Sequence, residues 1–137
     1  MLHLAVRSGN AEVVRFVIEE TGANVNKPNF NQDTALHQAA KLGKKQSMQN
    51  FSEKIPGNES VVAALIKAGA NVNVLNRDGD YALHHAASNG HKAVVEKLLK
   101  QGAEVDARNL RLETPLILAV KNSHLEVVGM YISIFGK

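Results

Sequence analysis

The sequence predicts an all-α fold, a solenoid of short helix-turn-helix units joined by β-hairpin fingers. A four-residue pattern recurs at a nearly constant spacing along the 137 residues, and small apolar residues follow it at helical spacing. Aromatic residues make up only 4% of the chain, and tryptophan is absent. A core of alanine, valine and leucine between closely packed helices needs few large rings. Units of this kind bury their apolar sides by stacking in a row.

The recurring pattern marks one structural position in four successive stretches. It reads LH at 2–3, TALH at 34–37, YALH at 81–84 and TPLI at 114–117. The spacing between the last residues of the pattern is 34, 47 and 33 residues. The middle spacing equals one period of 33 plus an insertion of 14, at about 44–57. The sequence therefore predicts a single domain, 1–137, with units at about 1–28, 29–75, 76–108 and 109–137.

The third unit shows which residues predict each element. Leu83, Ala86 and Ala87 lie at positions i, i+3 and i+4, which form one stripe of a short helix. The two alanines are small, so a neighbouring helix can approach closely. The Val-Val and Leu-Leu pairs within 94–99 form the stripe of a second helix. The Asp-Gly pair at 78–79 supplies the tight turn of a finger.

This order of features resembles the ankyrin repeat, which carries Thr-Pro-Leu-His, Ala-Ala, Gly-His, Val-Val, Leu-Leu and Gly-Ala in succession. The resemblance covers nearly the whole chain apart from the insertion. It implies two antiparallel helices and one finger per unit. It also implies binding to another protein or peptide segment through the finger tips and the concave side of the first helices, with no cofactor.

One histidine recurs at the same position in three units: His3, His37 and His84. The resemblance implies that it hydrogen-bonds the turn and the neighbouring unit. A metal or catalytic role is the weaker alternative, because scattered helical histidines lack a motif such as His-Glu-x-x-His. His91 and His124 begin second helices and have the same interpretation. His85 replaces the usual apolar residue after the pattern, and we expect it to be partly exposed.

The insertion at 44–57 has two interpretations. Met48, Phe51 and Ile55 lie at i, i+3 and i+7, so part of it could be an amphipathic helical turn that docks a partner. A mobile surface loop is the simpler interpretation, because loops tolerate insertions.

Both ends of the array depart from the family pattern. The first unit lacks its finger, so that either the gene starts here or the chain is a piece of a longer array. The segment MYISIF at 130–135 is unusually apolar where the third unit has Lys97, Gln101 and Gly102. A terminal unit normally has a polar outer face. A truncated array, a frayed end, or a surface that meets a partner or a second copy would each explain this departure.

The resemblance also places the candidate contact residues, which lie on the fingers and the first helices. They are Phe30, Asp33, Lys41, Leu42, Arg77, Asp78, Asp80, Ser88, Asn89, Leu110, Arg111, Leu112, Glu113 and Lys121. Asp33, Asp80 and Glu113 share one finger position, which predicts an acidic row across three units.

A basic row is predicted beside the acidic one, because Arg7, Lys41 and Lys121 share one position on the first helices, interrupted by Ser88. A peptide across the concave face would then meet alternating charge, which favours specificity more than affinity. Leu112 stands where the family usually has glycine. The apolar residues expected to supply affinity are Phe30, Leu42, Leu110 and Leu112.

Composition narrows the function classes. The net charge is only +3 and no run exceeds two consecutive basic residues, so nucleic-acid binding is poorly supported. There is no cysteine, no phosphate-binding glycine loop, no signal peptide and no membrane-spanning apolar run. We therefore expect no enzyme and no metal, but an intracellular interaction module, cytoplasmic or nuclear, acting as adaptor, scaffold or inhibitor. The alternatives are a targeting or substrate-recruiting segment of a larger multidomain protein, catalytic or not, and self-association through the apolar C-terminal helix.

Overall fold

The computed structural model describes residues 2–42 and 58–135, and these form eight α-helices in four consecutive pairs. Each pair is called a unit below, and its members are the first and second helix of that unit. The helices are α1 (Leu2–Arg7), α2 (Ala11–Thr21), α3 (Ala35–Leu42), α4 (Asn58–Lys67), α5 (Ala82–Ser88), α6 (Lys92–Lys100), α7 (Pro115–Lys121) and α8 (Leu125–Phe135). The prediction of an all-α solenoid is confirmed.

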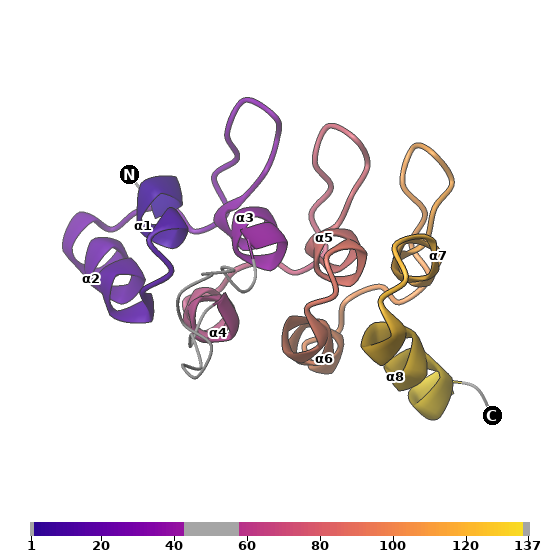
Figure 1. Cartoon of the computed structure of the whole chain (residues 1–137). Helices are drawn as coiled ribbons and strands as arrows, with labels where there is room; N and C mark the ends of the chain where they lie inside the picture. The colour runs from indigo at the N-terminus through magenta and orange to yellow at the C-terminus, as the bar shows by residue number, and fades with distance from the viewer. Residues whose placement is uncertain (1, 43–57, 136–137) are drawn as a thin grey trace.

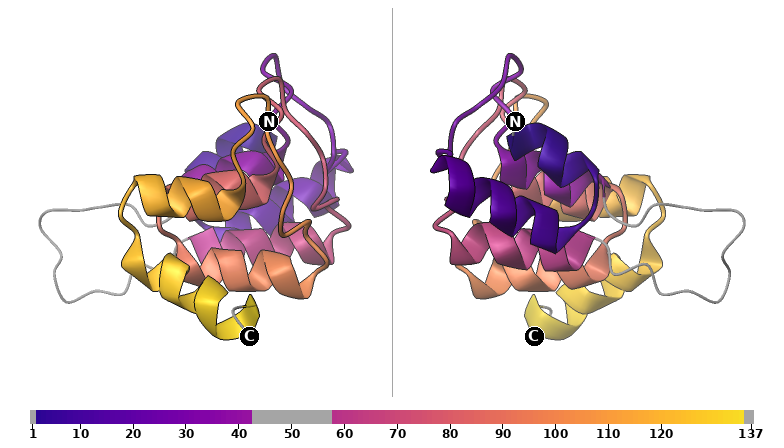
Figure 2. Two further views of the ribbon diagram at one scale, coloured as in Figure 1. Left: turned by 90° about the vertical axis from the view of Figure 1, so that its right-hand side faces the viewer. Right: turned by 90° about the vertical axis from the view of Figure 1, so that its left-hand side faces the viewer.

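The units stack in a row, with α1 at one end of the array and α8 at the other (Figure 1). The first helices α1, α3, α5 and α7 lie side by side in one layer, and the second helices form a layer beneath them. Three fingers project from the layer of first helices, on the side away from the second helices (Figures 1 and 2). A row of this kind leaves the fingers and first helices as one continuous surface.

Small and branched apolar residues fill the space between the layers, as the sequence predicts. Leu36, Leu65, Leu83 and Leu98 are fully buried, and each contributes about 2 kcal/mol of hydrophobic stabilisation. The alanine pairs of the first helices, Ala39 with Ala40 and Ala86 with Ala87, are 0% exposed. Their small size lets α3, α5 and α7 approach each other closely.

Glycine and histidine meet at the junction between the third and fourth units. Gly90, in the turn after α5, has a φ of +75°, and an added Cβ there would lie 2.5 Å from Nδ1 of His124. The His124 ring donates through Nε2 to the carbonyl of Ser88 at 2.8 Å. The absence of a side chain at Gly90 thus lets the ring reach back to the preceding unit.

The fingers have the shape of hairpins, but none of their described residues forms a β-strand. Two backbone hydrogen bonds close each tip, such as those from Asn76 N–H to the Asp80 carbonyl and from Gly79 N–H to the Asn76 carbonyl, at 3.0 Å each. A single backbone hydrogen bond joins neighbouring fingers, from Arg77 N–H to the Asn31 carbonyl and from Leu110 N–H to the Asp78 carbonyl, at 2.9 and 3.1 Å. Pairing this short is too limited for a strand.

The apolar C-terminal segment is helical as far as Phe135, so it is not a frayed end. Figure 1 shows α8 tilted away from the direction that α4 and α6 share. Met130 and Tyr131 are buried, whereas Ile132, Ile134 and Phe135 are half-exposed or more. The predicted insertion at 44–57 lies outside the described residues.

Candidate partner-binding surface

The recurring histidines His3, His37 and His84, called anchor histidines below, each join a first helix to the next finger. The Nδ1 atom of His37 accepts the N–H of Thr34 at 3.0 Å, so its Nε2–H donates to the carbonyl of Asp80 at 2.8 Å. Burial is the main cause that lowers the pKa of His37. The ring therefore stays neutral at pH 7 and can accept and donate at the same time.

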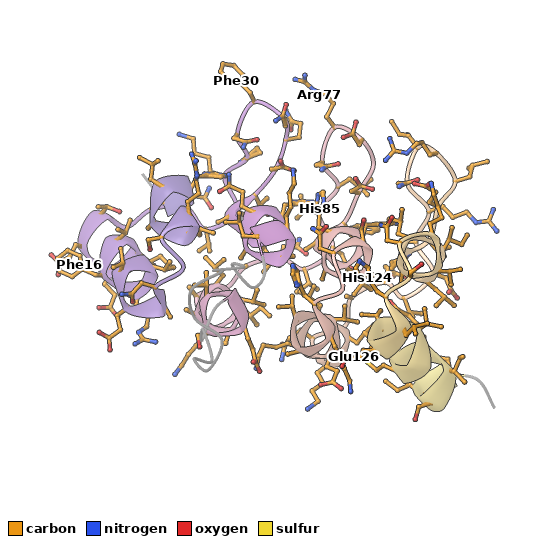
Figure 3. The ribbon with its side chains drawn as sticks, viewed as in Figure 1. Phe16, Phe30, Arg77, His85, His124 and Glu126 are labelled. Carbon is orange, nitrogen blue, oxygen red and sulfur yellow. The ribbon has the colours of Figure 1, made fainter. Side chains whose placement is uncertain are left out.

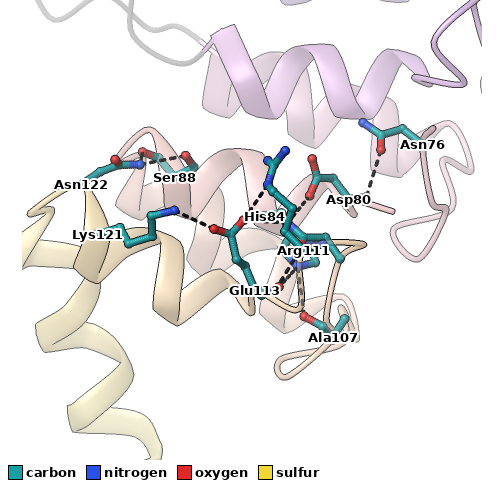
Figure 4. Close-up of polar contacts among 10 residues, drawn as sticks. Asn76, Asp80, His84, Ser88, Ala107, Arg111, Glu113, Lys121 and Asn122 are labelled. Atoms are coloured by element: carbon teal, nitrogen blue, oxygen red, sulfur yellow. Dashed lines mark hydrogen bonds and ion pairs between the residues drawn. The ribbon is translucent and has the colours of Figure 1, made fainter. Parts of the chain in front are cut away.

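The same bridge recurs at the other junctions. Nε2 of His84 lies 3.0 Å from the carbonyl oxygens of both Ala107 and Glu113 (Figure 4), and the Nε2 atom of His3 lies 3.1 Å from that of Asp33. The structural role predicted for these histidines is confirmed. In the fourth unit Ile117 occupies the anchor position, and it is 43% exposed.

An asparagine at the start of each finger organises its tip. The Oδ1 atom of Asn76 accepts the N–H groups of Asp78 and Asp80 at 2.9 Å each, and Asn29 and Asn109 do the same in their own fingers. This set was missed by sequence reasoning. Its signal was present, since the three asparagines follow the same spacing of 47 and 33 residues as the recurring pattern.

The asparagine amides also connect successive fingers through the acidic row. Asn76 donates through Nδ2 to Oδ1 of Asp33 at 2.8 Å, and Asn109 donates to Oδ1 of Asp80 at 2.9 Å. Asp80 is only 7% exposed and Asp33 is half-buried. The three acids do form a row, but these carboxylates point between the fingers, where they stabilise the stack, and not outward.

Glu113, the third acid of the row, is likewise 8% exposed. Its carboxylate accepts from Nζ of Lys121 at 2.7 Å, from Nδ2 of Asn109 at 3.2 Å and from Nε of Arg111 at 3.2 Å (Figure 4). The hydrogen bond from Lys121, then that from Asn109, lowers the pKa of Glu113 to about 2. The carboxylate is thus ionised over the physiological range and holds two cations in place.

Ser88 and Asn89 also support the stack. From the fourth unit, Asn122 donates to the carbonyl of Ser88 at 3.0 Å (Figure 4), and His124 donates to the same carbonyl at 2.8 Å. The Asn89 side chain donates back to the carbonyl of Lys41 at 3.0 Å. The interruption of the basic row at Ser88 therefore coincides with a bond between units.

His85 is half-buried, in agreement with the expected partial exposure. Its Nε2 lies 3.3 Å from Nδ2 of Asn76, and its ring meets the ring of His37 edge-on at a centroid distance of 5.8 Å. Burial is the main cause that lowers the pKa of His85. The neutral ring can accept from the Asn76 amide and so continues the polar contacts beneath the fingers.

The finger tips carry the exposed apolar residues that the sequence predicts. Phe30 is 91% exposed, Leu110 75% and Leu112 69%. Figure 3 shows Phe30 and Arg77 pointing outward from the tips of neighbouring fingers, where Arg77 donates to the carbonyl of Phe30 at 2.7 Å. Leu42, at the end of α3, is 44% exposed.

The turn at Leu112 has a backbone that suits glycine. Its φ is +64°, and Gly79 at the matching position has a φ of +76°. A left-handed conformation costs a residue with a Cβ about 1–2 kcal/mol. Gln32 adopts the same conformation with a φ of +64°.

Other faces of the described residues offer little chemistry. A shallow depression of about 380 Å³ lies between α6 and α8, lined by Glu96, Leu99, Lys100, Ile134 and Phe135. Within 2–42 and 58–135, no three histidines, aspartates or glutamates gather as metal ligands would. No helix in the same ranges has the length and apolar character needed to cross a membrane.

The fold and this surface define a class, the helical tandem-repeat proteins. A family model for ankyrin repeats in three copies matches residues 1–54 and 52–132. The chain therefore belongs to the ankyrin-repeat family. Ankyrin repeats are in general protein–protein interaction modules, and the repeat itself is a non-catalytic fold.

The chain is also similar to a relative with a much longer sequence. It is 30% identical over 125 residues to a transient receptor potential cation channel subfamily A member 1 homolog of Caenorhabditis elegans. The match covers 91% of this chain and 9% of that protein.

Proposed function

We propose that the chain binds another protein or peptide segment through its finger tips and the exposed ends of its first helices, as an adaptor, a scaffold or a competitive inhibitor. An intracellular location, cytoplasmic or nuclear, is part of this proposal. Five predicted residues, Asp33, Asp80, Ser88, Asn89 and Glu113, support the surface through bonds between units. The proposed contact set is Phe30, Lys41, Leu42, Arg77, Asp78, Leu110, Arg111, Leu112 and Lys121.

The observation that carries this proposal is the exposed leucine at a left-handed turn position. Gly79 makes the same turn without the strain that a Cβ brings, so the turn itself does not require a leucine at 112. A side chain that costs stability and is 69% exposed is best explained by contact with something outside the chain. Leu110 lies two residues away on the same tip.

A double substitution tests the surface. We expect Phe30→Ala with Leu110→Ala to abolish partner capture from cell lysate, read out by mass spectrometry, because both side chains are almost fully exposed. Helix content in circular dichroism should stay unchanged. The matched control is Phe16→Ala with Leu125→Ala, which removes the same side-chain types, 63% and 80% exposed, from α2 and α8. Partners retained at wild-type level by the finger variant would show that the surface lies elsewhere.

The similarity to a short stretch of a much longer protein supports a second candidate. In it, these repeats are the targeting or substrate-recruiting segment of a larger multidomain protein, catalytic or not. The full-length transcript tests this candidate directly. A catalytic domain encoded next to the repeats would support it, and a transcript that encodes only the repeats would contradict it.

Self-association through α8 is a further proposal on the partner. It is supported by the exposed side chains of Ile132, Ile134 and Phe135 on one helix. Sedimentation of the wild type and of Ile132→Ser with Phe135→Ser tests it. A dimer that the double variant abolishes supports the proposal, and a monomeric wild type at high concentration contradicts it.

A further inference from the structure

On this surface the positive side chains are exposed, and most of the negative ones are buried. The exposed cations on the described fingers and first-helix ends are Arg7, Lys41, Arg77, Arg111 and Lys121. The acids of the same region are mostly turned inward, since Asp80 and Glu113 are buried and Asp33 is half-buried. Asp78 is the exposed acid in the described part of this surface. An approaching partner therefore meets positive charge first.

Three of these cations are fixed before any partner binds. Glu113 accepts from Lys121 and Arg111 at 2.7 and 3.2 Å, yet these two side chains remain 60% and 68% exposed. The guanidinium of Arg77 is fixed by its 2.7 Å bond to the carbonyl of Phe30. Long side chains that are already ordered lose less entropy on binding.

Apolar side chains are interleaved with the fixed cations along the row of tips. Arg111 stands between Leu110 and Leu112 in sequence, and Arg77 is hydrogen-bonded to the residue that carries the Phe30 ring. The three fingers lie side by side in the array (Figure 1). A ligand that spans the tips must therefore carry negative and apolar groups in close succession.

Building on the function proposed above, we propose that the partner is an acidic segment of another protein. Its carboxylates pair with the exposed cations, and its apolar side chains cover Phe30, Leu110 and Leu112. A nucleic acid fits less well, because single strands bind proteins through series of stacking rings. The described part of this surface has one exposed ring, that of Phe30.

Selection from random peptides displayed on phage tests the chemistry directly. We expect the enriched sequences to combine aspartate or glutamate with leucine or aromatic residues, and to bind more weakly as salt is raised. Enriched peptides that are neutral or basic, or whose affinity does not respond to salt, would overturn the inference.

Charge-neutralising variants locate the contact for a synthetic copy of the most enriched peptide. Arg7→Gln with Lys41→Gln should weaken its binding by up to roughly fivefold per cation, the range of exposed ion pairs. The control is Lys92→Gln with Lys100→Gln, which removes two exposed cations from α6 in the other layer. Equal weakening in both variants would indicate attraction by net charge and would overturn the inference.

Two further arms separate this inference from the proposed function. Phe30→Ala with Leu110→Ala should abolish binding of the peptide, and binding that survives it would contradict the proposed surface as well. Peptides that require the fingers but carry no acids would contradict the inference alone. An oligouridine is the probe for nucleic acid. If it binds the wild type as tightly as the peptide does, and binds the Arg7→Gln with Lys41→Gln variant more weakly, the choice of a protein partner is overturned.

Discussion

The two layers of the array are joined to their neighbours in different ways. Between fingers and first helices, hydrogen bonds of fixed geometry connect successive units, such as those from His84 and Asn109 to the neighbouring finger. Between second helices, apolar side chains such as Leu65 and Leu98 provide the packing, and exposed asparagines in the loops after these helices add hydrogen bonds to the next unit. Hydrogen bonds fix register, whereas apolar packing tolerates a change of angle. This difference explains how α8 can tilt while α7 stays in line.

The apolar layer should carry the largest share of stability. Leu98→Ala removes a side chain that is 0% exposed, and we expect a loss of about 2–5 kcal/mol in the free energy of unfolding. Urea denaturation measures it. Lys92→Ala on the same helix is the control, because an exposed surface substitution should stay within about 0.5 kcal/mol. A loss below 1 kcal/mol for the leucine would mean that the second helices pack loosely.

Replacing asparagines that bond the backbone should cause the next largest loss of stability, and the loss should be greater where the asparagine is buried. Asn109, only 4% exposed, satisfies two backbone N–H groups, so Asn109→Ala should cost about 1–3 kcal/mol. Asn26, in the loop that follows α2, bonds the backbone of Gly69 and Asn71 in the next unit from an exposed position, and Asn26→Ala should cost less than about 1 kcal/mol. Chemical denaturation of both variants gives the comparison. Equal losses would show that burial does not decide the strength of these bonds.

A substitution at the turn of Leu112 should raise the stability of the protein, in contrast to the two changes above. Leu112→Gly relieves a left-handed φ of +64°, and we expect a gain of about 1 kcal/mol in stability, visible as a higher midpoint of thermal unfolding. Ala68→Gly, an exposed substitution at the end of α4, is the control for added chain entropy. A destabilised Leu112→Gly variant would mean that the leucine supports its own finger.

The smallest expected effect is a pH dependence at Glu113. Its pKa is about 2 in the folded protein against an ordinary value of 4.5, so the unfolded chain takes up the proton at higher pH. The stabilisation is therefore complete above 4.5 and is lost as the pH falls toward 2. The thermal midpoint of the wild type should fall more steeply over this range than that of Glu113→Gln. Parallel curves would contradict the ionised network.

The repeat period predicted the helices well because helix pairing depends on positions that the chain shows directly. Ala86 and Ala87 must face a close neighbour, and the anchor histidine can be recognised in the sequence of three units. The orientation of a carboxylate is different. Asp80 and an exposed acid look alike in sequence, and only the position of Asn109 in the next finger shows that Asp80 is enclosed.

The sequence predicted that the C-terminal segment is an apolar helix, but not the direction in which this helix runs. The apolar residues at 130–135 indicated a helix without a polar outer face, and the structure contains one. Its tilt depends on packing of Met130 and Tyr131 against the layers, which no local pattern encodes. The left-handed turn at Leu112 was visible in sequence as a leucine in place of glycine.

Ile117 at the anchor position has a consequence for recombining these units. A copy of residues 76–108 grafted behind the fourth unit would present its finger carbonyl to a branched hydrocarbon instead of an imidazole. The seam would then lack the bridge that the other junctions share, and Ile117→His would restore a donor there. One interchangeable side chain thus contributes to the compatibility of adjoining modules, while the helical framework around it stays the same.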